Sequence, residues 1–193
     1  MIFLDVGGHD GQTLEELVKP GWPFTAVHSF EPMPDQFATL TERFGDRVEC
    51  HNFGLLDRTG IVDVYGDNAN MGSSVYADKV DVNAETVTAC QMVRASEWFA
   101  DHVVEAAVKL NCEGSEVPIL LDLCDSGEIH KVAAMMIDFD VRKIPSAKGG
   151  ENEAIRRLAD VGFDRFVLCE DSMHGDTHQD RTRAWLAVLG IER

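Results

Sequence analysis

Short apolar runs alternate with amphipathic stretches along most of the chain, and the two patterns predict different elements. Runs that are apolar throughout or alternate residue by residue predict strands, and they cover Ile2–Val6, Phe24–Phe30, Arg47–Phe53, Ala106–Leu110, Val132–Phe139, Arg165–Cys169 and Arg183–Leu189. Stretches with a helical apolar period predict helices at Thr13–Lys19, Pro34–Phe44, Ala95–Ala100, Ser115–Cys124 and Glu151–Val161. The alternation predicts an α/β fold, a mostly parallel central sheet with helices on both faces, closed by Arg183–Leu189 as its last strand.

The segment between the third and fourth of these strands differs in character. Ile61–Tyr65 and Thr86–Val93 are β-prone and predict accessory strands, while residues 67–74 are polar and rich in turn formers. The segment His174–His178 contains two histidines and an acid but no third strong metal ligand nearby, so we predict a polar hairpin loop and no metal site.

Length and composition indicate one domain spanning residues 1–193. With 193 residues, 45% of them hydrophobic, the chain can bury a full core. No apolar stretch is long enough to cross a membrane, and Ile2–Val6 is too short for a signal sequence. The five cysteines are odd in number and lack CxxC spacing. We therefore predict free thiols in a reducing compartment and a cytoplasmic protein.

Charge narrows the range of partners. Asp and Glu number 34 against 17 Lys and Arg, a formal charge of −17. A protein that holds a nucleic-acid backbone needs a basic track, and the sequence has none. We expect a small-molecule substrate, no nucleic acid and no membrane, and the sequence leaves the oligomeric state open, a homo-oligomer included.

A glycine-rich turn follows the first predicted strand. It runs from Asp5 through Gly7, Gly8, His9 and Gly11 to Gln12. A strand, a glycine turn and a helix present a nucleotide-like ligand at the carboxyl edge of an α/β sheet. The spacing is not that of the dinucleotide fingerprint, and an acid before the turn suits an ammonium group better than a pyrophosphate. S-adenosylmethionine has that ammonium, a ribose and no phosphate. The alternative is a tight turn with a solvated acid.

A second acid ends the neighbouring predicted strand. Glu31, followed by Pro32, lies where a carboxylate can accept hydrogen bonds from both ribose hydroxyls. The adenine pocket should draw on Asn52, Phe53 and Gly54 at the end of the third strand, although a plain core role for Phe53 is an equal alternative.

Three blocks of this sequence resemble the FkbM-type methyltransferases. They are residues 5–12 (DVGGHDGQ), residues 30–32 (FEP) and residues 109–116 (KLNCEGSE). The resemblance covers about Ile2 to Asp140. It implies a Rossmann-like class I methyltransferase fold, S-adenosyl-L-methionine as cofactor and a small hydroxylated, sugar-like acceptor. It also matches Ser74, with Ser73, to a serine pair in the family's loop, while their alternative is an exposed turn.

The sequence departs from the family pattern in two places. The family tends to have alanine and asparagine where this chain has Gly8 and His9. It usually has aspartate where this chain has Asn111, which removes a negative charge next to the expected reaction centre.

Methyl transfer to oxygen needs alignment and a base near the carboxyl ends of the first, fourth and fifth predicted strands. The catalytic candidates are Lys109, Asn111, Glu113 and Asp138, with Asp140 and His9 as further carriers of a base. Glu113 is the first choice; its alternative role is to favour a helix N-terminus. Lys109 could orient the substrate, or pair with Glu113 or Glu116.

The sequence thus predicts an S-adenosylmethionine-dependent O-methyltransferase. Two alternatives stay open: a cofactor-binding but inactive methyltransferase-like subunit, and a nicotinamide-dependent oxidoreductase. The oxidoreductase is disfavoured by the glycine spacing and because neither Tyr65 nor Tyr76 has a lysine at the short spacing of a catalytic Tyr–Lys pair.

Overall fold

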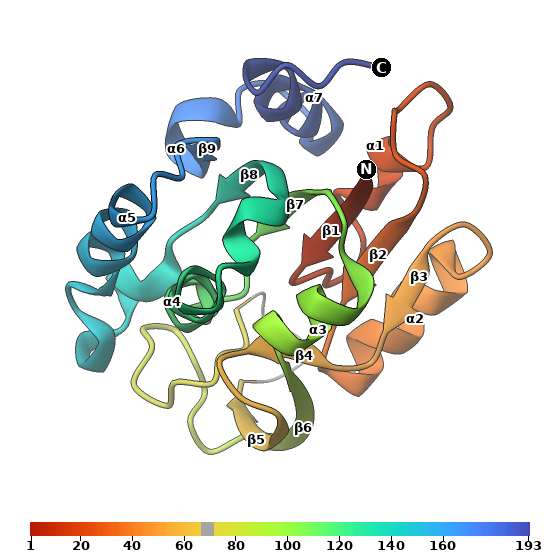
Figure 1. Ribbon diagram of the computed structural model, residues 1–193. Helices are drawn as coiled ribbons and strands as arrows, with labels where there is room; N and C mark the ends of the chain where they lie inside the picture. Colours follow the sequence, from red (N-terminus) through yellow and green to blue (C-terminus); the bar gives the residue numbers. More distant parts are fainter. Residues whose placement is uncertain (67–71) are drawn as a thin grey trace.

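The computed structural model describes residues 1–66 and 72–193, and its centre is a six-stranded sheet (Figure 1). The strands lie in the order β3 (Glu49–His51), β2 (Val27–Phe30), β1 (Ile2–Val6), β7 (Ala106–Leu110), β8 (Val132–Ile137) and β9 (Phe166–Leu168). Each neighbouring pair is parallel. Counted along the chain within this sheet, the order is 3-2-1-4-5-6, so it reverses between β1 and β7. Ligands of open α/β sheets bind at such a reversal, outside the carboxyl ends of the strands.

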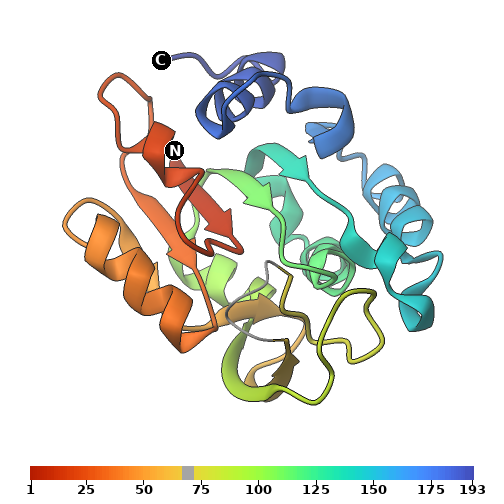
Figure 2. The ribbon, with the colours of Figure 1, turned by 180° about the vertical axis from the view of Figure 1, so that it is seen from behind.

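Helices cover both faces of this sheet (Figures 1 and 2). One face packs against α1 (Leu14–Leu17), α2 (Pro34–Phe44) and α7 (His178–Val188), and the other against α3 (Ala95–His102), α4 (Glu116–Ser126) and α5 (Gly150–Asp160). Alternate residues of a strand point to opposite faces. In β1, Phe3 packs on the α7 side while Leu4 and Val6 pack on the α4 side, and both sets are buried. The predicted α/β architecture is confirmed.

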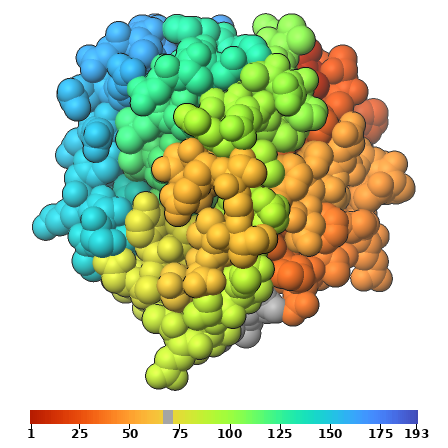
Figure 3. Space-filling view, turned by 60° about the horizontal axis from the view of Figure 1, so that its bottom comes forward, coloured from red at the N-terminus to blue at the C-terminus, as the bar shows by residue number. Residues whose placement is uncertain are grey.

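A second, three-stranded sheet lies beside the carboxyl edge of the first. β6 (Val87–Arg94) pairs in parallel with β4 (Gly54–Leu56) and antiparallel with β5 (Gly60–Tyr65). Its segments occupy the middle of the face seen in Figure 3. Met33, Leu56, Val64, Cys90 and Met92 form its own small core. The accessory strands are therefore confirmed, whereas β4 was not predicted, and residues 67–71 of the predicted polar loop lie outside the described residues.

The expected closing strand is wrong, because Arg183–Leu189 belongs to helix α7. Thr177 caps this helix: its hydroxyl accepts from the Asp180 backbone N–H, and the Asp180 carboxylate accepts from the Thr177 backbone N–H at 3.1 Å. Such a reciprocal capping box fixes a helix start. The predicted polar hairpin at residues 174–178 is likewise a loop that leads into α7 rather than a turn between two strands.

Several boundaries also differ from the prediction. The second strand begins at Val27 rather than Phe24, the third is limited to Glu49–His51, and α1 has only four residues. The remaining segments are single-turn helices: η1 (Glu128–Lys131), η2 (Asp140–Lys143), η3 (Pro145–Ala147) and α6 (Cys169–Ser172). Within the described residues, none of the helices combines the length and the apolarity that a bilayer crossing requires.

Candidate functional site

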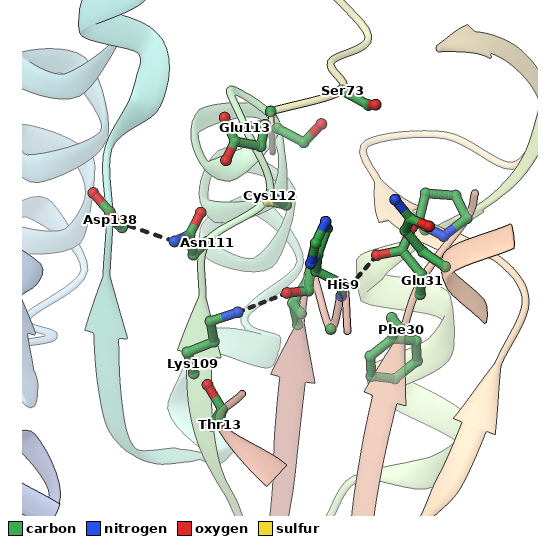
Figure 4. Close-up of a pocket in the computed structure, with 18 of the residues that line it drawn as sticks. His9, Thr13, Phe30, Glu31, Ser73, Lys109, Asn111, Cys112, Glu113 and Asp138 are labelled. Carbon is green, nitrogen blue, oxygen red and sulfur yellow. Dashed lines mark hydrogen bonds between the residues drawn. The ribbon is translucent and has the colours of Figure 1, made fainter. Parts of the chain in front are cut away.

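A cavity of about 510 Å³ opens where the strand order of the main sheet reverses. Its walls come from three parts of the chain: the turns after β1, β2, β7 and β8, the small sheet, and the C-terminal segment around α6 and α7. Figure 4 shows Lys109, Asn111 and Asp138 at the ends of neighbouring strands, across from His9 and Glu31. A volume of this size lies within the range of small-molecule sites.

The glycine turn forms the floor of the cavity at β1. Gly7, Gly8, His9 and Gln12 line it, and His9 has a left-handed backbone with φ of 47°. A Cβ at Gly7 would lie 1.8 Å from the backbone oxygen of Asn111, so glycine is needed here for the turn to pack against the end of β7. Gly11 lies outside the lining and packs on Phe44 of α2. At these two positions glycine is therefore needed for packing within the protein. The sequence had predicted instead that these glycines let a ligand approach the backbone.

Asp5 does not line the cavity. Its side chain is fully buried, and its Oδ1 lies 3.0 Å from the Nζ of Lys109, the residue opposite it in the β1–β7 ladder. Lys109 Nζ also donates to the Gly7 backbone oxygen at 2.7 Å. The prediction that Asp5 contacts a ligand ammonium is therefore wrong, because the Asp5 carboxylate is paired with Lys109 inside the protein. Lys109 reaches the cavity wall, but its ammonium is bound to Asp5 and Gly7 rather than to Glu113 or Glu116.

Glu31 lies in the cavity wall directly after β2. Its two carboxylate oxygens accept the backbone N–H groups of His9, at 2.8 Å, and Met33, at 2.9 Å. Burial raises the pKa of this carboxyl, and the two N–H groups oppose that rise. A carboxylate oxygen has two acceptor positions, so each oxygen keeps one for a ligand. Glu31 is thus a buried, oriented acceptor facing the cavity.

Of the three residues expected to form an adenine pocket, Asn52, Phe53 and Gly54, only Gly54 lines the cavity. Pro32, Gly54 and Leu55 line the cavity, together with Val64 and Met92 of the small sheet. Asn52 and Phe53 do not line it. The Asn52 side chain donates to the Glu31 backbone oxygen at 3.1 Å and so supports the β2 turn. The Phe53 ring packs against Phe30, with centroids 5.7 Å apart. Phe53 therefore has the core role.

Ser73 lines the cavity, whereas Ser74 is buried behind it. Ser74 Oγ donates to the backbone oxygen of Glu113 at 2.6 Å and accepts from the Tyr76 N–H. Ser74 therefore attaches this loop to the turn after β7, and of the predicted serine pair only Ser73 faces the cavity.

Glu113 projects into the cavity from that turn. Its Oε2 lies 2.7 Å from the Nζ of Lys79, a buried lysine that the sequence prediction missed because no element or motif marks it. Burial raises the pKa of Glu113, the Lys79 ammonium lowers it, and the nearby Asp140 carboxylate raises it further. The turn is held by Glu116, whose buried carboxylate accepts the N–H groups of Cys112 and Gly114. Glu116 therefore holds the turn that precedes α4.

Asn111 and Asp138 lie side by side at the ends of β7 and β8. Asn111 Nδ2 donates to Asp138 Oδ2 at 3.1 Å, and both side chains line the cavity. Burial and the Asp140 carboxylate raise the pKa of Asp138. The amide oxygen of Asn111 and the second oxygen of Asp138 are oriented acceptors in the wall of the cavity that Glu113 also lines.

The C-terminal segment forms a wall that the sequence prediction missed. Cys169, Glu170, Met173, His178 and Arg181 line the cavity, and His178 Nε2 lies 3.3 Å from the Thr13 hydroxyl. Because residues 183–189 were predicted as a strand at the edge of the sheet, the C-terminal segment was not expected to line the cavity. The threonine–aspartate capping pair at residues 177 and 180 was the available signal.

Comparison with known proteins adds no relative: no protein-family model, no curated protein and no solved structure matches the chain. The fold and the cavity define the class at a coarser level. The protein is an α/β protein with a Rossmann-like parallel sheet and a small-molecule-sized cavity at the carboxyl ends of its central strands.

Proposed function

We propose that this protein is an S-adenosylmethionine-dependent methyltransferase that methylates an oxygen of a small hydroxylated molecule such as a sugar. The observation that carries the proposal is Glu31: a buried carboxylate after β2, held by two backbone N–H groups, in the wall of the cavity at the strand-order reversal. Its remaining acceptor positions suit the two hydroxyls of a ribose. Leu55, Val64 and Met92 supply an apolar wall for the attached base.

Several features favour this nucleoside over a dinucleotide. A pyrophosphate is usually bound at the N-terminus of the helix after the glycine turn. Here that helix, α1, has four residues, and Asp10 in the turn lines the cavity. A short helix offers a weak dipole, and a nearby carboxylate repels a phosphate.

The bound cofactor would supply a methyl group already activated on a sulfonium. The protein's task is then to align an acceptor hydroxyl and to remove its proton. Glu113 is the candidate base, because burial raises its pKa and it faces the cavity. Asn111 and Asp138 are the candidate acceptors that orient other hydroxyls of the substrate. Lys109 acts indirectly, by holding the glycine turn through Gly7.

One observation favours the inactive, cofactor-binding alternative. The Glu113 carboxylate is already paired with the Lys79 ammonium, and an ion pair lowers the basicity of a carboxylate. Cofactor binding and turnover must therefore be measured separately.

The cofactor is tested first, by thermal unfolding. S-adenosylhomocysteine should raise the melting temperature in proportion to the logarithm of its concentration, and NAD should not. Glu31→Gln should weaken binding of S-adenosylhomocysteine by about 1.5–3 kcal/mol, as expected for hydrogen bonds to a charged group. Glu42→Gln, an exposed change on the neighbouring α2, serves as the matched control. Stabilisation by NAD alone would overturn the proposal.

Turnover is tested second, with labelled donor and a library of hydroxylated metabolites. Labelled product supports the methyltransferase. Binding of S-adenosylhomocysteine without product from any acceptor class favours the inactive subunit.

A further inference from the structure

Two histidines and a glutamate gather on the sheet face opposite α7, outside the cavity lining. His28 Nδ1 lies 3.1 Å from His51 Nε2 and 3.5 Å from Glu49 Oε2. All three atoms lie within 4.8 Å of one another. The sheet register explains the grouping, because His28 of β2 pairs with Glu49 of β3, and His51 lies two residues further along β3 on the same face.

We propose that His28, Glu49 and His51 bind one zinc ion that joins the edge strand β3 to β2. Two nitrogens at 2.0–2.1 Å from a tetrahedral zinc are about 3.3 Å apart, close to the separations observed here. Imidazole and carboxylate together are a ligand set that zinc takes in proteins. A water molecule would complete the coordination.

The surroundings suit a bound ion. The Trp98 ring packs edge-on against both imidazoles, with centroids 5.5 Å from His28 and 5.9 Å from His51, and shields them on the protein side. The Glu49 side chain is 65% exposed, so an ion has a path from solvent. The two imidazole planes are 8° apart and their nitrogens face each other. Without metal, His28 Nδ1 and His51 Nε2 share one hydrogen bond. Modest rotations of the two rings would point the lone pairs of these two nitrogens at an ion that lies beside that hydrogen bond.

The ion would have a structural role. β3 has three residues and one neighbouring strand, so its place in the sheet rests on few hydrogen bonds. The backbone oxygen of His51 accepts the N–H of Glu31 at 3.0 Å. A metal that fixes β3 therefore also fixes the residue that faces the cavity. The zinc site itself does not depend on the proposed methyltransferase activity.

The test is calorimetric titration of zinc into full-length protein that has been stripped of metal with a chelator. Wild type should bind one equivalent of zinc, with a raised melting temperature, and should discriminate against magnesium, which the acidic surface would otherwise attract. His51→Gln and Glu49→Gln should each weaken zinc binding by at least about 10–100-fold, the loss found when even an outer partner of a ligand is removed. His130→Gln, a change of an exposed histidine, should bind as wild type.

The variants also separate a failed fold from a failed site. If circular dichroism shows that His51→Gln does not fold, the exposed Glu49→Gln decides. Absence of stoichiometric zinc binding in wild type would overturn the proposal. So would wild-type affinity in folded Glu49→Gln.

Discussion

Glu113 is the residue whose conformation most needs an explanation. It has φ of 56°, in the left-handed region, and the Gly114 after it has φ of 112°. A left-handed backbone conformation costs free energy for a non-glycine residue. Such a conformation persists only where the surrounding structure imposes it, often at a functional site. Here the Ser74 hydroxyl bonds its backbone oxygen and Lys79 holds its side chain. The turn is therefore built to aim this carboxylate.

If Glu113 is the general base, Glu113→Gln should lower turnover by roughly 10²–10⁴-fold and leave the affinity for S-adenosylhomocysteine unchanged. The amide keeps the shape and one acceptor for Lys79 but has no basicity. Turnover is measured with an acceptor identified by the library screen, and binding by calorimetry. Asp138→Asn is the matched variant on the neighbouring strand. A fully active Glu113→Gln beside an inactive Asp138→Asn would move the base to Asp138.

The family resemblance predicted from the sequence would place an aspartate at position 111, and the contact of Asn111 gives a physical reason for an amide there. The Asn111 amide donates to the Asp138 carboxylate. An aspartate in its place would put two carboxylates at hydrogen-bond distance, and one would have to hold a proton. The amide therefore allows both groups to stay oriented without that cost.

At the scale of elements, local pattern identified the six strands of the main sheet, missed β4 and took part of α7 for a strand. β7 coincides with its predicted range, because an apolar run bounded by turn formers is distinct in sequence. Arg183–Leu189 is also an apolar run, and periodicity alone does not separate a short strand from a buried helix segment. Trp185 and Leu186 are fully buried. The capping pair at residues 177 and 180 decides between them, and the sequence prediction treated that segment as a hairpin.

The site was predictable where it depends on strand ends and unpredictable where it depends on partners distant in sequence. Glu31, Asn111 and Asp138 follow strands, so their place at the cavity could be read from the pattern. That Asp5 pairs with Lys109 depends on which strands are neighbours and in what register. The register does not follow from the pattern of single segments, so the prediction left Asp5 free for a ligand.

The cap of α7 can be tested through stability. Thr177→Ala should lower the free energy of unfolding by about 1 kcal/mol, within the 0.5–2 kcal/mol range of N-cap losses. The reason is that the Asp180 N–H loses its side-chain acceptor. Urea unfolding measures the change. Thr39→Ala, an exposed position inside α2, is the control and should be close to neutral. Equal effects of the two changes would contradict a stabilising cap at residue 177.

Across the whole molecule, the way acids are buried decides how stability depends on pH. Among the described residues, the buried carboxyl groups belong to Asp5, Glu16, Glu31, Glu116, Asp122 and Asp140. Four of them pair with cations, and Glu16 alone has three cationic partners: Lys19, Arg183 and Arg193. These pairs use cations that are scarce in a chain with net charge −17. The carboxylates of the other two, Glu31 and Glu116, accept hydrogen bonds from backbone N–H groups.

Glu116 should therefore make the folded state more stable at mildly acidic pH. Burial raises its pKa from 4.5 to about 7, against the opposing effect of the Gly114 and Cys112 N–H groups. Between these two values the folded protein holds a proton that the unfolded chain releases. Stability from this group accordingly rises as pH falls from 8 toward 5, by at most about 1.4 kcal/mol per pH unit.

The measurement is urea unfolding of wild type and Glu116→Gln at pH 8, 7, 6 and 5. Gln has no proton to gain, so the free-energy difference between the two proteins should shift in favour of wild type as the pH is lowered. Other titrating groups are common to both proteins and cancel in this difference. Thr39→Ala, an exposed change that removes no titrating group, should show a difference from wild type that stays nearly constant with pH. A wild-type advantage over Glu116→Gln that is constant from pH 8 to 5 would mean that the backbone N–H groups keep Glu116 ionised, and that its pKa is not raised.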